Sequence, residues 1–257
     1  MRLIVYDVEV FAFDWIVVFK DVETGTHTVI HNDSEALREC LFDDGIYVGF
    51  NSKHYDQFII KAAANDFTPQ EIKQLNDFLI GGGRGWEYAP LKAFYFRFNN
   101  VDIRDDVQLG LSLKAIEGHM GMDIQETEVS FDLDRPLTED ELQQTVHYCK
   151  HDVDATHELM KLRADYLKTK KNLGKRAGID EVRSLAATNA KLTAMMLRAE
   201  RKEWDDGREY VYPENLDIAV IPKPILDFFE TIHDMSIPDE VLFKTSFEIE
   251  IGGMPCK

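Results

Sequence analysis

The sequence predicts an α/β protein with a mixed five-stranded sheet and helices on both of its faces. Three segments of strand character, separated by short turns, fill the first thirty-one residues, which is typical of an antiparallel arrangement. Two more apolar segments, at residues 46–50 and 96–103, alternate with amphipathic helical segments, as expected where later strands join the same sheet. The length of 257 residues allows one such core together with a C-terminal extension.

The individual elements follow from apolar periodicity and from start signals. Residues 2–10 carry apolar side chains on both faces, which predicts a central strand covered on both sides, and strands are also expected at residues 14–19 and 26–31. Helices are expected at residues 34–41 (capped by Ser34), 54–64, 69–80 (opened by Thr68 and Pro69), 112–119, and from the capping box Thr138–Glu141 onward.

Composition excludes several classes of protein. Apolar runs fall short of the roughly 18 residues that a membrane span needs, and the acidic N-terminal segment does not resemble a signal peptide. Cys40, Cys149 and Cys256 are widely spaced, which favours a reduced cytoplasmic protein over a thiolate zinc site.

Charge is distributed unevenly along the chain. The formal net charge is −18, yet the segment from Lys161 to Lys202 holds twelve Lys and Arg residues against four Asp and Glu. Such a basic segment is typical of a nucleic-acid contact, but it is equally typical of a solvated helical face, and both explanations stay open.

Asp7 and Glu9 form the first candidate constellation. Alternate residues of a strand point to the same face, so the two carboxylates are expected side by side, after the apolar Leu3 and Val5 on that face. Crowded carboxylates resist ionisation unless a cation neutralises them, which indicates a metal site. Exposed acids at a strand end are the alternative.

Two further constellations lie later in the chain. Asn51 and Asp56 are placed where a buried strand passes into a helix, although an N-terminal acid also serves a helix dipole. In the long helix, Tyr148 and Asp152 lie about 40° apart on one flank of the apolar stripe, whereas His147 lies about 140° from Asp152.

Taken together, these motifs resemble the DEDD superfamily of 3′→5′ exonucleases. That superfamily carries Asp-x-Glu on its first strand, an Asn-x-x-x-Phe/Tyr-Asp motif entering a helix, and a helical motif ending in Asp. The counterparts here are Asp7 to Glu9, Asn51 to Asp56, and Tyr148 to Asp152, and the resemblance spans about residues 1–165. It implies a ribonuclease H-like fold.

The resemblance also implies roles for these residues. Asp7, Glu9, Asp56 and Asp152 would hold two divalent cations, Mg²⁺ or Mn²⁺, with Asp7 bridging them. The tyrosine subtype is favoured, since His147 lies more than two turns inside the helix, and Tyr148 would then orient the attacking water. Substrate contacts are expected from two groups of residues: Phe50, Asn51 and Tyr55 at the terminal nucleotide, and Lys170, Lys171, Lys175 and Arg176 in the basic segment.

The domain organisation predicted is an exonuclease domain at 1–165, a basic helical extension at 166–204 and an acidic segment at 205–257. This arrangement resembles the N-terminal part of bacteriophage-type DNA polymerases. It implies proofreading of a primer 3′ end or another single-stranded DNA in the bacterial cytoplasm, beside a C-terminal polymerase domain. An RNA-trimming exonuclease of the same superfamily and a non-catalytic binding module remain the alternatives.

Overall fold

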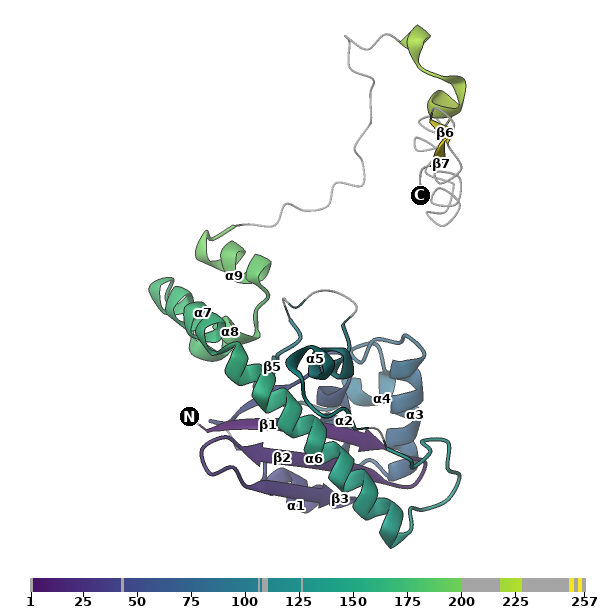
Figure 1. Ribbon diagram of the computed structural model, residues 1–257, viewed down its shortest axis with the longest axis vertical. Coiled ribbons are helices and arrows are strands. Elements are labelled where there is room, and N and C mark those ends of the chain that lie inside the picture. The colour runs from purple at the N-terminus through teal and green to yellow at the C-terminus, as the bar shows by residue number, and fades with distance from the viewer. Residues whose placement is uncertain are drawn as a thin grey trace. The chain divides into compact units, whose positions relative to one another are not determined.

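The chain forms two compact units, Met1–Glu200 and Arg201–Lys257. The computed structural model describes residues 2–42, 44–105, 107, 111–125, 127–199, 218–227, 250–251 and 254–255. Figure 1 traces the elements along the chain.

A five-stranded mixed sheet is the centre of the first unit. Its order is β3-β2-β1-β4-β5, in which β1 pairs antiparallel with β2 and parallel with β4. The remaining pairs are antiparallel for β2 with β3 and parallel for β4 with β5. The strands are β1 Leu3–Val10, β2 Trp15–Asp21, β3 His27–His31, β4 Ile46–Gly49 and β5 Asn100–Asp102. The predicted α/β class with a mixed five-stranded sheet is therefore confirmed.

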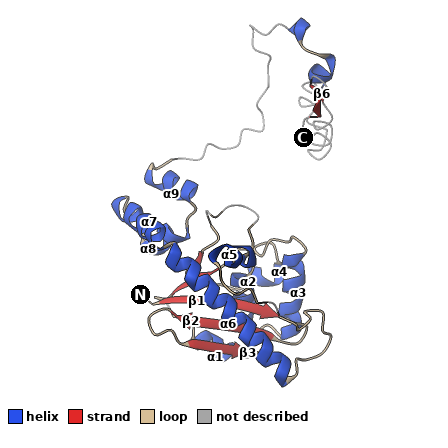
Figure 2. Cartoon of the chain, in the orientation of Figure 1, coloured by secondary structure: helices blue, strands red, loops and turns tan. Residues whose placement is uncertain are grey.

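Helices cover both faces of this sheet, and α6 crosses β1 and β2 on one of them (Figures 1 and 2). Side chains that alternate along β1 divide between two cores. Tyr6 and Val8 pack with α1, α2, α3 and α4, whereas Val5 packs with α5, α6 and α8. The helices are α1 Ser34–Glu39, α2 Asp56–Ala64, α3 Pro69–Ile80, α4 Ala89–Lys92, α5 Leu113–Met120, α6 Glu139–Leu162 and α8 Glu181–Ala186.

The predicted helix starts agree with the structure at two capping boxes and differ at α1. Thr68 and Thr138 accept hydrogen bonds from the backbone N–H three residues later, and the Glu at that position bonds back in each case. The expected cap at Ser34 is wrong, because the Asp33 carboxylate accepts from the Ala36 N–H and Ser34 is already helical. The strand expected at residues 96–103 is also shorter, covering only Asn100–Asp102.

The basic segment folds as separate helices, α7 Ala164–Arg176, α8 and α9 Asn189–Met196. The prediction that Lys170 contacts nucleic acid is wrong for this arrangement, because its side chain is only 3 % exposed. The Lys170 ammonium donates to the backbone carbonyls of Leu185 and Ala187. It thereby ties α7 to the end of α8, where buried carbonyls need a donor.

The second unit is described only in part. It holds a 3₁₀ turn at Ile218–Val220 and a short antiparallel pair, β6 Glu250–Ile251 with β7 Met254–Pro255. Most of the acidic segment predicted at 205–257, including Cys256, lies outside the described residues. Within the described part of the chain, no helix combines the length and apolar character needed to cross a membrane.

Candidate functional site

The first two candidate residues lie at the C-terminal end of the central strand. Asp7 and Glu9 follow Val5 at alternate positions of β1, opposite Val18 and Ile16 of β2. Val5, Ile16 and Val18 belong to the core beneath α6. The two acids therefore continue an apolar face that α6 covers.

Asp56 lies at the end of a tight connection between β4 and α2. The connection begins at Gly49, where an added Cβ would lie 2.6 Å from the Ser52 Cβ and 3.1 Å from the Tyr6 ring. Ordinary van der Waals contact would require more room, so only glycine fits without movement there. Asp56 is then the first residue of α2 and is 5 % exposed.

The fourth acid comes from α6, more than 140 residues after Asp7. Cys149 and Val153 of this helix are fully buried in the core beneath it. Asp152 is nearly buried at 8 % exposure, and Tyr148 is half-buried. The helical register predicted for this segment is consistent with these positions.

These elements bring all four acids to one cavity of about 390 Å³. Phe50, Asn51 and Tyr55 also line it. His147 is exposed and lines a different hollow along α6, together with Glu139 and Lys150. Lys171, Lys175 and Arg176 are exposed on α7 and are not among the residues that line the acidic cavity.

Burial and mutual repulsion disfavour ionisation of the acids. The pKa of Asp7 rises from its ordinary 3.8 to about 7, first because the carboxyl is buried and then because Asp152 is near. The pKa values of Glu9 and Asp56 are raised well above their ordinary values by burial, and next by the charge of Asp7. Each carboxylate thus lacks enough positive charge around it.

The donor set suits hard divalent cations. Ligand atoms of Asp7, Glu9 and Cys149 lie within 4.8 Å of one another. Burial, followed by repulsion from Asp7, raises the pKa of the Cys149 thiol well above its usual value, and the thiol donates to Asp7 Oδ2 at 3.5 Å. Because a protonated thiol is a poor ligand, the oxygen atoms dominate the site, as Mg²⁺ and Mn²⁺ prefer.

Lys114 of α5 is a site residue that the sequence analysis missed. Its ammonium forms ion pairs with Asp152 and, at 3.4 Å, with the fully buried Glu117. The same ammonium lies 4.8 Å from the centroid of the Tyr148 ring. No motif surrounds Lys114, and only the packing of α5 on α6 brings it to the site.

Asp102 at the end of β5 is a second residue that sequence reasoning missed. This buried carboxylate accepts from the backbone N–H groups of Asn51 at 2.9 Å, Lys53 at 3.1 Å and Arg104 at 2.9 Å. Asn51 has a φ of 60°, in the left-handed region. Asp102 therefore fixes the connection between β4 and α2, which contains Asn51 and leads to Asp56.

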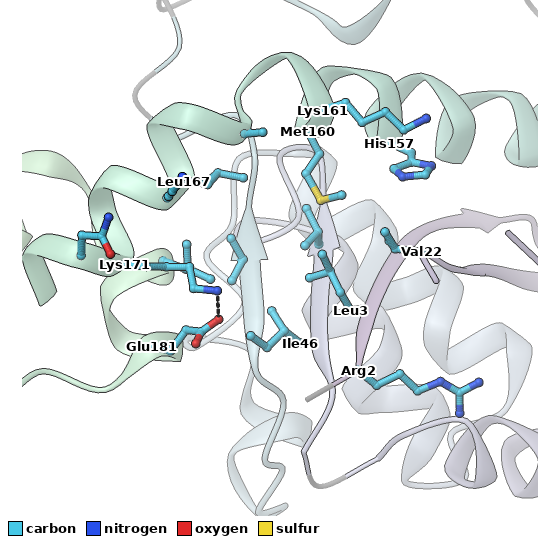
Figure 3. A pocket seen from close by; sticks show the side chains of 16 residues that line it. Arg2, Leu3, Val22, Ile46, His157, Met160, Lys161, Leu167, Lys171 and Glu181 are labelled. Carbon is cyan, nitrogen blue, oxygen red and sulfur yellow. Dashed lines mark ion pairs between the residues drawn. The ribbon is translucent and has the colours of Figure 1, made fainter. Parts of the chain in front are cut away.

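A larger cavity of about 980 Å³ lies elsewhere in the first unit (Figure 3). Apolar side chains such as Leu3, Ile46 and Leu167 line it, and Lys161 and Lys171 are among its polar residues. Glu181, the acid among the described residues of its lining, is paired with Lys171. The described lining of this cavity does not bring several acids together, so the larger cavity is not the candidate site for cation chemistry.

Comparison with known proteins adds no relative: no protein-family model and no curated protein matches this chain.

The raised pKa values predict how the stability of the metal-free protein depends on pH. Between about pH 4 and pH 7 the folded state binds more protons than the unfolded chain, so the free energy of unfolding should fall as pH rises. Asp7→Asn should flatten this slope and stabilise the protein at pH 7 by on the order of 1–4 kcal/mol, at about 1.4 kcal/mol per pKa unit. Urea denaturation in EDTA measures both effects.

Glu39→Gln is the matched control, because it removes one exposed acid outside the site. Equal slopes for the wild type, Asp7→Asn and Glu39→Gln would contradict the repulsion described.

Proposed function

We propose that this protein is a metal-dependent 3′→5′ exonuclease of the DEDD superfamily with a ribonuclease H-like fold. One observation carries the proposal: the four acids of three motifs, separated by up to 145 positions in the sequence, line a single cavity. Such convergence is what a two-cation hydrolase needs. The sheet, whose central β1 lies between antiparallel and parallel neighbours, agrees with the fold that the motifs imply.

Asp7, Glu9, Asp56 and Asp152 would hold the cations. Bound there, Mg²⁺ or Mn²⁺ would supply activation of a water molecule and stabilisation of the departing 3′ oxygen. The raised pKa values of Asp7, Glu9 and Asp56 support this assignment, because bound cations would favour the ionised carboxylates. Cations also reverse the sign of the local field and make phosphate binding favourable.

Tyr148 would orient the attacking water. Burial, and then the nearby Asp152 carboxylate, raises the pKa of its hydroxyl. The hydroxyl thus stays protonated at neutral pH and acts as a hydrogen-bonding group instead of a base. Lys114 would balance the charge of Asp152 until a cation binds, because it is the cation that Asp152 contacts among the described residues.

The substrate would be a single strand that enters with its 3′ end. Phe50 and Asn51 would contact the terminal nucleotide, and the ring of Tyr55 would line its pocket while the Tyr55 hydroxyl is bonded to Asn76. On α7, Lys175 and Arg176 remain candidates for distant phosphates, whereas Lys171 is already paired with Glu181. We further propose proofreading within a phage-type DNA polymerase, in the cytoplasm of the bacterial host.

The direct test uses single-stranded DNA labelled at its 3′ or 5′ end, with and without Mg²⁺. The 3′ label should be released as a mononucleotide, and the 5′ label should give a ladder of shortening products, only with the metal. Asp7→Ala should abolish cleavage without loss of folding, because it removes a cation ligand and relieves repulsion.

Other results of the same assay would contradict the proposal or favour one of the alternatives. Cleavage in EDTA, or by Asp7→Ala in Mg²⁺, would refute the proposal. Faster cleavage of a matched RNA would favour the RNA-trimming alternative, and binding of DNA without any cleavage would favour a non-catalytic module.

Tyr148 and His147 provide a second prediction. Tyr148→Phe should slow cleavage by roughly ten- to a thousandfold, the scale for loss of one positioned group, at unchanged metal binding. His147→Ala should leave the rate unchanged, because His147 is exposed, whereas Tyr148 is half-buried beside Asp152. Single-turnover rates on saturating substrate test this, and the reverse pattern would overturn the assignment to the tyrosine subtype.

A further inference from the structure

Arg104 is a cationic side chain in the lining of the acidic cavity, which Lys114 borders through its ion pair with Asp152. Among the described residues that line it there are four acids, Asp7, Glu9, Asp56 and Asp152, and one cationic side chain, Arg104. The four acids account for the divalent cations of the proposed function. Arg104 has no part in that assignment, so its presence in the lining needs another explanation.

Arg104 is held firmly at the backbone. It lies in the turn two residues after the end of β5. Its N–H donates to Asp102 at 2.9 Å, and the N–H of the preceding Ile103 donates to the Gly49 carbonyl at 2.9 Å. Asp102 also fixes the Asn51 N–H. The same buried carboxylate thus sets the positions of Asn51 and Arg104 relative to each other.

The side chains of Arg104 and Asn51 are hydrogen-bonded to each other, and both present N–H groups that can donate to a ligand. Arg104 Nη1 donates to Asn51 Oδ1 at 2.7 Å, and the guanidinium carbon lies 6.0 Å from the centroid of the Phe50 ring. Because a guanidinium carries only donors, this bond determines that the Asn51 oxygen faces Arg104 and that the Asn51 amide NH₂ faces away from it. A guanidinium has five N–H groups, and this bond uses one of them.

We propose that Arg104 binds a second phosphate of the substrate strand, the one next to the phosphate that is hydrolysed. The inference rests on the proposed function, in which the acids and their cations hold the first phosphate. A neighbouring phosphate in the same cavity needs a cation of its own, and a guanidinium matches phosphate oxygens with paired N–H donors. Arg104 is therefore a substrate-positioning residue that sets the register of the strand.

A specific substrate requirement follows. A strand with two or more internucleotide linkages should bind better than a dinucleoside monophosphate, which has only the linkage to be cleaved. The last linkage of a strand has no neighbouring phosphate for Arg104 to bind, so the enzyme should cleave that linkage inefficiently.

The test is a double-mutant cycle between Arg104 and the substrate. Oligonucleotides carry one uncharged methylphosphonate at the second, third or fourth linkage from the 3′ end. Binding is measured by fluorescence anisotropy in Ca²⁺, and single-turnover cleavage is then started with Mg²⁺. In the wild type, the change at the second linkage should weaken binding about ten- to a hundredfold, the scale of a hydrogen-bonded charge pair.

Arg104→Gln should weaken binding of the unmodified strand by a similar factor, and the methylphosphonate at the second linkage should then cost no more than about twofold. Arg104→Lys should recover part of the affinity, since it keeps the charge. Arg84→Gln is the matched control, because it removes an exposed arginine that does not line the cavity, and it should behave as the wild type.

Equal penalties at the second linkage in the wild type and in Arg104→Gln would overturn the proposal for Arg104 while leaving the exonuclease intact. Coupling at the third or fourth linkage instead would overturn the assigned position. Failure of the wild type to cleave any strand in Mg²⁺ would reject the proposed function, and the role of Arg104 with it.

Discussion

Four crowded carboxylates repel one another in the acidic cavity, and the other features of the site follow from this repulsion. Asp7, Glu9, Asp56 and Asp152 come from β1, the start of α2 and α6, and they line one small cavity. Burial raises the pKa of Asp7 to about 7, and it also disfavours ionisation of Glu9 and Asp56. A fold that maintains such a cluster loses stability when metal-free at neutral pH, and bound cations would restore it.

The surrounding structure holds these acids where they would otherwise separate. Two cores, one on each face of the sheet, fix β1 between α2 and α6. Asp102 binds three backbone N–H groups and shapes the connection before Asp56, while Lys114 contacts Asp152 from α5. The positions of the acids thus depend on residues outside the acidic motifs, which act through hydrogen bonds and an ion pair.

Much of this arrangement could be predicted from the sequence, because it depends on local periodicity. Strand alternation placed Asp7 and Glu9 on one face, and helix geometry separated His147 from Asp152. Contacts between distant segments that lie outside the three motifs could not be predicted. The pairs Arg104–Asn51 and Lys114–Asp152 span 53 and 38 residues, and Lys170 is buried only because α8 folds back on α7. The basic composition of the segment predicted that Lys170 is exposed, but the packing of α8 against α7 buries it.

The four carboxylates are proposed to act together as a cation site. Calorimetric titration of the metal-free protein with Mn²⁺ at pH 7 tests this, with Asp7→Asn, Asp152→Asn and the surface variant Glu39→Gln in parallel. We expect two Mn²⁺ ions to bind and to release protons from the carboxyl groups whose pKa values are raised. Binding should be much weaker in both site variants and unchanged in Glu39→Gln. Absence of binding, or equal affinity in all four proteins, would contradict the proposal.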